Sequence, residues 1–484
     1  MKKLVALLLA VMMLCTGVAA VAENADAQKE PVTITFGGWG QYFLHTEWIE
    51  AFMEQYPWIN VEVVHPVTGS LWNAEITQLA ATGNMPDLFS CESLSYGVQN
   101  NWFYDLTDLF NADAESAAYP ENLLPYGMKD SRIYMLASDM YPYYIEVNLS
   151  LLDEMNLPYP EADWSIDEWV DLALELSKNT GCFAVDSLWE FVQILPGNYG
   201  KEALSVLSFN MEEKKWDFGD EMIDLYQKIT DLVASNAGYF EWATLNYAEP
   251  GTNEEADAKR KEYLQENLGV SSALWENGKI GMRVVYSYGA NWAQNSSIYT
   301  GFEYAAYPAP VAHKGDASRT CLQTDFLCMS SACEHPEEAY LLLKYMTYSI
   351  EGYEARINAM KQYDRDAMIA KYPDIDAAAF PESIANYAIP PIKDGAKVSE
   401  LLLSMGELTD GLGDIVSTAV SNGFIHPQRT VVGWWESRGH IWWNYLNCLI
   451  NGVHTPAQAV ESIDGYANTE LETVVNNYGF QFGK

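Results

Sequence analysis

The sequence predicts an α/β fold in which short strands alternate with helices. Strand-like runs occur at residues 32–36, 60–64 and 88–89, and helical periodicity fills the two gaps between them. The chain has 484 residues, 49% of them hydrophobic and 19% charged, which suits two or three domains or one large two-lobed unit. Because helices separate the three strands, we expect a parallel sheet with right-handed crossovers.

The first strand alternates apolar and polar residues and stops at Gly37 and Gly38. A helix is expected from Thr46 to Pro57, where the proline ends it. Its buried face is expected to comprise the apolar residues at helical spacing, namely Trp48, Ile49, Phe52, Met53 and Tyr56. Residues 60–64 then form the second strand.

The second helix should begin at a Ser70 cap and end at Gly83, because glycine suits the left-handed backbone at a helix C-terminus. Pro86 keeps this helix from resuming before the third strand. The expected buried stripe is Leu71, Trp72, Ile76, Leu79 and Ala80. In such sheets ligands bind beyond the carboxyl ends of the strands, which here are residues 39–43, 65–68 and 90–93.

A second α/β portion begins near Arg132. The run "RIYMLASDMYPYYIEVN" is interpreted as two strands that cross between lobes, and a helix at 149–155 follows. Ser165 and Glu168 have the spacing of a capping box at the start of the next helix, which Gly181 is expected to end. Residues 274–292 are expected to form a helix, a turn and a strand.

The remaining chain is expected to contain two strands followed mainly by helices. The runs "YAAYPAPV" and "TDFLCMSS" are typical of short strands. Residues 335–352 are expected to form one helix with Pro336 in its first turn, and residues 351–484 to be mainly helical.

The first 22 residues have the pattern of a secretory signal. Lys2 and Lys3 precede an apolar run at 4–14, and small residues at 20–22 suit cleavage before Glu23. A lipid anchor on Cys15 is the less favoured alternative, since a leucine stands where lipidation signals need a small residue. An uncleaved membrane anchor is disfavoured because the apolar run is short. We therefore expect a secreted protein of the extracellular, cell-surface or periplasmic space.

The charge of the chain excludes one class of partner. Removing the signal takes away two lysines and no acids, which moves the formal charge from −40 to −42. Such a surface repels nucleic acid and anionic lipid and favours neutral or cationic ligands. The same charge also serves simply to keep an exported protein soluble.

Cysteine spacing and enzyme motifs give little sign of cofactor chemistry. Beyond Cys15 there are six cysteines without a CxxC pair, which argues against zinc, and Cys328 in an apolar run is expected to be a buried thiol. The full set is Cys91, Cys182, Cys321, Cys328, Cys333 and Cys448. The sequence lacks GxSxG, Walker A and HExxH motifs, and "FGGWGQYF" lacks the third glycine of a dinucleotide fingerprint. No cofactor or metal is expected, and Asp139 with Glu146 is a weak candidate for a glycosidase pair among 67 acids.

The order of several phrases resembles that of the family 1 extracellular solute-binding proteins, the sugar-binding subunits of bacterial ABC importers, to which maltose-binding protein is distantly related. The matching phrases are residues 32–64, "LAATGNMPDLF" at 79–89, "NNWFYDLTDLF" at 100–110, residues 132–178, "WENGKIGM" at 275–282, "HPEEAYLLLKYMT" at 335–347 and "NGVHTPAQAVESI" at 451–463. The resemblance implies two α/β lobes, each a mostly parallel sheet flanked by helices, with a hinge between them and a ligand trapped on closure. Lobe one is expected to contain residues 31–140 and 304–350, and lobe two residues 145–300 and 355–484.

A sugar site needs flat aromatic rings for the C–H faces and polar groups for the hydroxyls. The chain has 16 tryptophans and 31 tyrosines. Trp48, Trp72 and Trp169 lie on helix stripes and are expected in the core. Trp39 and Tyr42, beyond the first strand, are candidate ligand contacts.

The resemblance adds candidate contacts in the other segments. Glu92 follows "PDLF" with Ser90, and Asp139 and Tyr141 lie in the first crossing segment, where relatives hold acids or aromatics. Further candidates are Tyr288, Trp189, and one of the pair Trp434 and Trp435 in "VVGWWESRGH". The region 351–430 matches no family phrase.

The expected function is the non-catalytic capture of a carbohydrate between aromatic rings from both lobes. The protein is then expected to deliver the carbohydrate, as a monomer, to the permease subunits of an ABC transporter. The alternatives are a secreted glycoside hydrolase, a binder of a peptide or another solute, and a cell-surface adhesin on the same fold.

Overall fold

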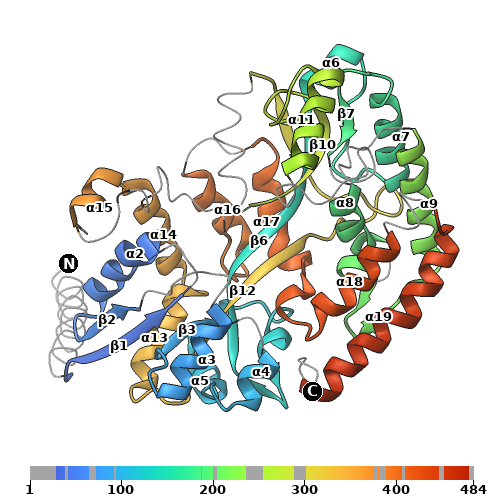
Figure 1. The fold of residues 1–484 in the computed structure, drawn as a ribbon. Coiled ribbons are helices and arrows are strands. Elements are labelled where there is room, and N and C mark those ends of the chain that lie inside the picture. Colours follow the sequence, from blue (N-terminus) through green and yellow to red (C-terminus); the bar gives the residue numbers. More distant parts are fainter. Residues whose placement is uncertain are drawn as a thin grey trace, which may run out of the picture.

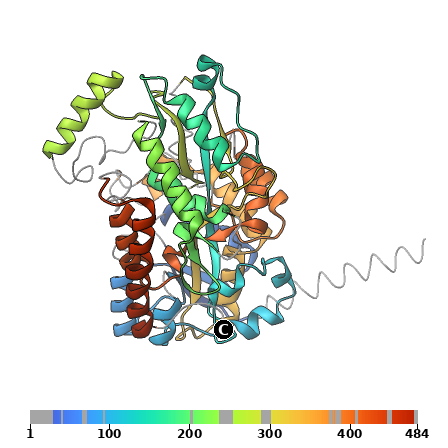
Figure 2. The same ribbon diagram turned by 90° about the vertical axis from the view of Figure 1, so that its right-hand side faces the viewer.

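The computed structural model describes residues 29–38, 42–64, 72–91, 94–186, 188–199, 204–235, 254–287, 301–371, 373, 377, 380, 388–405, 409–445 and 452–478. These residues form two lobes joined by long strands, with helices on both sides of the central strands (Figures 1 and 2). The expected two-lobed α/β fold is confirmed.

The predicted β-α-β-α-β unit opens the first lobe. It consists of β1 (Val32–Gly37), α2 (Tyr42–Gln55), β2 (Ile59–Val63), α3 (Trp72–Thr82) and β3 (Leu88–Cys91). β1 pairs parallel with both β2 and β3, as predicted. Gly83 has a φ of +71° and ends α3, while Ser70 lies outside the described residues. α2 begins at Tyr42 rather than Thr46, because no helix-breaking residue stands between them.

One long strand crosses from the first lobe to the second. β5 (Arg132–Ile133) is followed by β6 (Met135–Asn148), so the segment expected to be two strands contains a two-residue strand and one of 14 residues. β6 pairs antiparallel with β12 (Cys321–Met329) as far as Pro142, and from Tyr143 onward with β10 (Ile280–Tyr286). The strand order is β2-β1-β3-β12-β6-β10-β7, so the two crossing strands link both lobes in one sheet.

The second lobe surrounds the far half of β6. Its elements include β7 (Phe183–Val185), β11 (Tyr304–Tyr307), α6 (Leu149–Met155), α7 (Ile166–Leu176), α8 (Leu188–Ile194), α9 (Asp220–Ala234), α11 (Glu254–Leu268), α18 (Trp434–Tyr445) and α19 (Pro456–Tyr478). The capping box of α7 is confirmed, since Ser165 Oγ accepts from the Glu168 backbone N–H at 3.1 Å and Glu168 accepts in return from the Ser165 N–H at 2.8 Å.

Two expectations in this lobe are wrong. α7 ends at Leu176, five residues before Gly181, and the intervening chain turns through a bond from Asn179 N–H to the Leu176 carbonyl at 3.0 Å. Residues 274–278 form a turn rather than a helix, because five residues before a glycine at φ +65° leave no room for a helix before β10.

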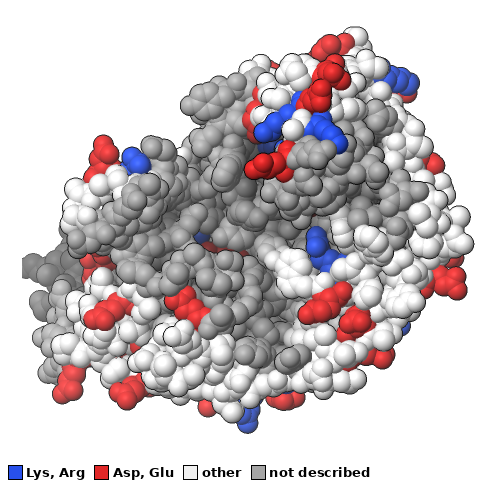
Figure 3. Space-filling view, in the orientation of Figure 1, with Lys and Arg blue, Asp and Glu red and all other residues white. Residues whose placement is uncertain are grey.

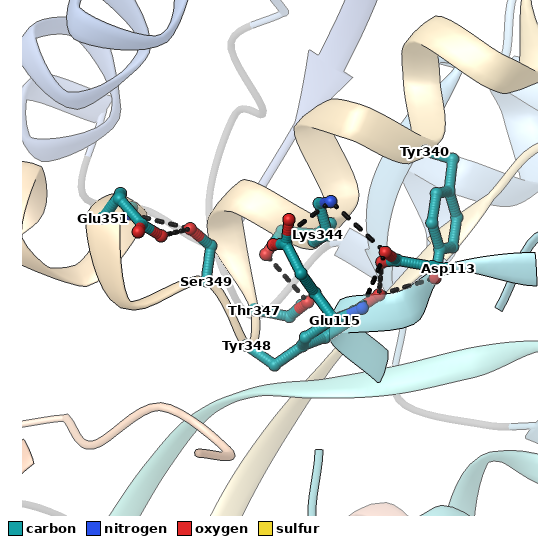
Figure 4. Close-up of polar contacts among 9 residues, drawn as sticks. Asp113, Glu115, Tyr340, Lys344, Thr347, Tyr348, Ser349 and Glu351 are labelled. Carbon is teal, nitrogen blue, oxygen red and sulfur yellow. Dashed lines mark hydrogen bonds and ion pairs between the residues drawn. The ribbon is translucent and has the colours of Figure 1, made fainter. Parts of the chain in front are cut away.

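The run expected to be one helix at 335–352 is two. α13 (Pro336–Met346), with Pro336 in its first turn, stops before α14 (Ile350–Gln362), and Ser349 caps α14. Figure 4 shows what holds the break. Asp113 accepts from the Tyr348 hydroxyl at 2.7 Å and pairs with Lys344 at 3.5 Å, and the Tyr340 and Tyr348 hydroxyls share a hydrogen bond of 2.6 Å.

Other described elements complete the chain. They are α4 (Leu94–Gln99), α5 (Thr107–Ala112), β4 (Met128–Lys129), β8 (Phe209–Asn210), β9 (Lys215–Trp216), α15 (Arg365–Lys371), α16 (Gly395–Leu403), α17 (Leu412–Asn422) and β13 (Phe424–Ile425). Short 3₁₀ helices lie at Ala114–Ala118, Leu124–Gly127, Leu195–Asn198, Val206–Ser208 and Pro427–Arg429. The chain after residue 350 is mainly helical where it is described, as predicted.

Each lobe has its own large apolar core. Trp48 lies in the first and Trp169 in the second, as predicted, whereas the Trp72 side chain lies outside the described residues. Buried residues of 353–420 pack in the first core and those of 431–471 in the second. The division of the chain between lobes stays a prediction, and this packing favours placing α14, α16 and α17 with lobe one rather than lobe two.

Candidate functional site

The candidate site is centred on one face of β6. Asp139, Tyr141 and Tyr143 alternate along the strand, so their side chains share a face. They lie on either side of the point where β6 changes partner from β12 to β10, and therefore between the two cores. Figure 3 shows the molecule hollowed between its lobes. On this face of β6, Tyr141 and Tyr143 are buried, whereas Asp139 is partly exposed.

A buried arginine organises the lobe-one end. The two terminal nitrogens of the Arg356 guanidinium donate to the two carboxylate oxygens of Asp139, with Nη2 at 3.3 Å from Oδ2. The Arg356 side chain is 2% exposed and that of Asp139 is 19% exposed. The guanidinium carbon lies 5.0 Å from the centre of the Trp48 ring. Bidentate pairing thus fixes a carboxylate whose outer edge still meets solvent.

A second acid stands beside this pair. Asp325 lies at an irregularity in the pairing of β12 with β6, where it stands opposite residues 138 and 139, and the Ser138 hydroxyl donates to its backbone carbonyl at 3.2 Å. Burial raises the pKa of the Asp325 carboxyl to about 8, and the nearby Asp139 charge adds to the rise, while Arg356 opposes it. Asp325 therefore keeps its proton at neutral pH, which spares the cluster a second buried negative charge.

Stacked rings organise the lobe-two end. Tyr143 stacks on His426 with ring centres 6.1 Å apart and contacts Tyr286 edge-on at 5.3 Å. His426 in turn contacts Trp434 at 5.1 Å. His426 Nδ1 accepts a hydrogen bond from the backbone N–H of Gln428 at 3.0 Å. Burial, with a smaller effect of Arg438, lowers the pKa of His426 to about 3, so the imidazole is neutral.

Arg438 links two tryptophans on this side. Its guanidinium carbon lies 5.2 Å from the ring of Trp189 and 5.3 Å from that of Trp435. Trp442, on the next turn of α18, contacts Trp189 edge-on at 4.4 Å. Below them, burial raises the pKa of Glu190 to about 7 although Arg438 acts against the rise. Arg438 and the rings of Trp189, Trp435 and Trp442 thus form one aromatic and cationic cluster held by α8 and α18.

The structure places five of the nine sequence-predicted residues. Asp139 and Tyr141 lie together on β6, and Trp189 and Trp435 lie together across Arg438. Trp434 is 1% exposed inside the second core, whereas Trp435 is 57% exposed. The remaining candidates, Trp39, Glu92, Tyr288 and the Tyr42 side chain, lie outside the described residues.

Sequence reasoning missed Asp325, Arg356, His426 and Arg438. Arg356 lies in the region that matched no family phrase. The chain has 27 lysines and arginines against 67 acids, so each cation is a candidate partner for a functional acid. Only the structure shows that Arg356 is buried. His426 is 4% exposed, and Tyr143, on which it stacks, comes from a distant segment, so no local pattern marks the pair.

The described residues contain no group of three or more His, Cys, Asp or Glu side chains that could hold a metal ion. Cys91, Cys182, Cys321, Cys328 and Cys333 are buried thiols, which confirms the expectation for Cys328, while Cys15 and Cys448 lie outside the described residues.

The weak glycosidase pair also fails on geometry. Asp139 and Glu146 stand seven positions apart on one strand, on opposite faces, which separates them by roughly 23 Å, and glycosidase carboxyls lie about 5–10 Å apart. Glu146 is instead a buried partner of Arg283, whose Nη2 donates at 2.7 Å.

Comparison with known proteins agrees with this architecture. A family model described as bacterial extracellular solute-binding protein matches residues 37–348. No curated protein matches the chain significantly. Among the described residues, the helices are too short or too polar to cross a membrane.

Solved structures share the fold at low identity. One is an ABC substrate-binding protein from Listeria monocytogenes in complex with cycloalternan, 16% identical, with a TM-score of 0.61 over 93% of this chain and 100% of that one. Another is a cyclic alpha-maltosyl-1,6-maltose binding protein from Arthrobacter globiformis, 13% identical, with a TM-score of 0.64 over 92% of this chain and 100% of that one. A third is the sugar-binding protein MalE from Xanthomonas citri, 13% identical, with a TM-score of 0.63 over 91% and 98% of the two chains.

Proposed function

Because the chain belongs to the family of bacterial extracellular solute-binding proteins, we propose that it captures an oligosaccharide between its lobes and delivers it to the permease of an ABC importer. The observation that carries the proposal is the shared face of β6, on which a fixed carboxylate, two tyrosines and a stacked histidine lie between the two cores. Cycloalternan and cyclic alpha-maltosyl-1,6-maltose, bound by two proteins of the same fold, suggest the ligand class.

The chemistry of this face suits a sugar. A sugar ring presents apolar C–H surfaces and a rim of hydroxyls, which call for flat rings and for carboxylates. Asp139 offers its exposed edge to hydroxyl hydrogens, and Tyr141 lies next to it. Trp435 supplies an exposed ring on the lobe-two side, backed by Arg438 and Trp189. We assign the stacking role in the tryptophan pair to Trp435, since Trp434 is already enclosed by protein.

The other predicted contacts stay part of the proposal. Trp39 or Tyr42 is proposed to cover the ligand from lobe one together with Glu92, and Tyr288 from lobe two. Binding is proposed to be non-catalytic, with closure by bending at the crossing segments. The protein is proposed to act as a monomer after signal cleavage before Glu23, without a lipid on Cys15.

The experiment is a thermal-shift screen of the mature chain with cycloalternan, acarbose, maltooligosaccharides and short peptides. A ligand at about 100 times its dissociation constant adds about 2.7 kcal/mol to the free energy of unfolding. A shift with a saccharide that chromatography then recovers intact supports the proposal. Cleavage of the saccharide would favour a glycoside hydrolase, and a shift with peptides alone would favour a peptide binder. The intact mass of the exported protein decides whether Cys15 carries a lipid.

A further inference from the structure

Two acids and one arginine meet where the crossing strands run side by side. Asp139 comes from β6, Asp325 from the neighbouring β12, and Arg356 from α14. Both terminal guanidinium nitrogens of Arg356 are committed to Asp139. The cluster thus holds two carboxyls for one cation, in a protein whose formal charge is already −40.

We propose that Asp325 is a second ligand-contacting acid beside Asp139, and that the two carboxyls bind ligand as a unit carrying one proton at neutral pH. The proposal rests on the proposed function, since it deepens the same site. Asp325 lies deep between the strands yet, like Asp139, keeps a partly exposed surface. With its proton, Asp325 can donate to a ligand hydroxyl oxygen while Asp139 accepts from a hydroxyl hydrogen.

The groups around Asp325 decide where the proton lies. Asp139 and Tyr141 face the cluster from β6, and Arg356 and Tyr353 face it from α14. Burial and the nearby Asp139 charge keep the proton on Asp325, whereas Asp139 is held by the bidentate arginine. A ligand that covers Asp139 removes water from the cluster, strengthens the repulsion between the carboxyls and holds the proton more tightly.

A measurement without ligand tests whether Asp325 is protonated. A carboxyl whose pKa is raised on folding contributes stability that is fully present below its unfolded pKa and is lost as pH rises through the folded pKa. For Asp325 this window runs from about pH 4 to about 8. The unfolding temperature of Asp325→Asn, relative to that of the wild type, should therefore increase as pH rises from 5 to 8. Asp108→Asn, an exposed acid on α5, is the control and should follow the wild type.

A binding measurement tests the ligand contact. The probe is the saccharide among cycloalternan, acarbose and the maltooligosaccharides that gives the largest thermal shift. Wild-type affinity should fall between pH 7 and 9, by about fivefold if binding raises the pKa of the pair by one unit from about 8, with proton uptake seen by calorimetry in two buffers. Asp325→Asn should bind without proton uptake and with a flat profile.

The outcomes separate the two proposals. Equal pH dependence of unfolding in Asp325→Asn and wild type would overturn the protonated pair. Unchanged pH-dependent binding in Asp325→Asn would overturn the contact. If none of these saccharides raises the unfolding temperature of the wild type, the proposed function fails. The assignment of the proton to Asp325 still stands in that case, provided that Asp325→Asn shows the expected pH dependence of unfolding.

Discussion

At the scale of single residues, two neighbouring tryptophans have opposite surroundings. Trp434 is 1% exposed and packs against Trp216 and His426, whereas Trp435 is 57% exposed beside Arg438. One step along a helix rotates a side chain by about 100°, which is enough to move a ring from core to surface. Burial therefore assigns a stabilising role to Trp434, while Trp435 stays the proposed ligand contact.

We expect Trp434→Ala to lower the free energy of unfolding by about 3–5 kcal/mol, as for other buried tryptophans. Trp435→Ala should leave unfolding nearly unchanged but weaken saccharide binding by about 2 kcal/mol, or roughly 30-fold, through lost apolar contact. Urea unfolding and calorimetry measure the two effects. Trp443→Ala is the matched control, since Trp443 is 63% exposed on the same helix. Wild-type affinity in Trp435→Ala would remove this ring from the site.

Glu190 gives stability a pH dependence. Burial raises its pKa to about 7, above the usual value near 4.3 in an unfolded chain. The neutral carboxyl thus contributes stability in full below about pH 4, and this contribution is lost as pH rises through 7, at about 1.4 kcal/mol per pH unit.

We expect Glu190→Gln to lose less stability than the wild type between pH 5 and 8, by roughly 2–3 kcal/mol in urea unfolding. Glu436→Gln, an exposed acid on α18, should keep the wild-type slope. An unchanged slope in Glu190→Gln would mean that this carboxyl is ionised in the folded protein.

At the scale of elements, β6 is tied into each lobe by one buried arginine–carboxylate pair. Asp139, in the first half of β6, pairs with Arg356, and Glu146, near the end of β6, pairs with Arg283. Glu146 is fully buried, and burial raises its pKa although Arg283 opposes the rise. The strand that joins the lobes is thus held by an ion pair in each lobe.

Removing Arg283 should cost about 3–5 kcal/mol, because a buried carboxylate is left without its cation. We expect Arg283→Met to unfold at lower urea, and the double variant Glu146→Leu with Arg283→Met to recover most of the loss. Neither change should alter saccharide affinity by more than about twofold, since the pair points away from Asp139. Full additivity of the two single changes would contradict a direct coupling.

At the scale of the whole molecule, the predictable part of the fold is the part set by local pattern. The alternation of strands and helices from Val32 to Cys91 follows from periodicity and from glycine and proline signals, and it was confirmed by the parallel pairing of β1. The break between α13 and α14 depends on Asp113, which lies 235 residues from Tyr348.

The candidate site was harder to predict for the same reason. Asp139 and Tyr141 could be proposed from a resemblance, but Arg356 lies 217 residues from Asp139, and no local pattern pairs them. The irregularity in strand pairing that places Asp325 beside them is likewise a property of the assembled sheet. Contacts between side chains of such distant segments can therefore be identified only from the assembled structure.

The last prediction concerns the motion of the lobes. Each lobe has its own core, and the long strands β6 and β12 run between the two cores, so bending at these strands can move the lobes relative to each other. A ligand that contacts both lobes binds the closed state better and shifts the population toward it. Small-angle scattering should then show the radius of gyration falling toward the value of about 23 Å that a compact chain of this length has, when the best saccharide of the screen is added. Trp435→Ala should reach the same final radius but need about 30-fold more saccharide, because it weakens the contact without changing the hinge. A radius that stays constant while calorimetry records binding would mean that the lobes are already closed, and would remove hinge bending from the mechanism.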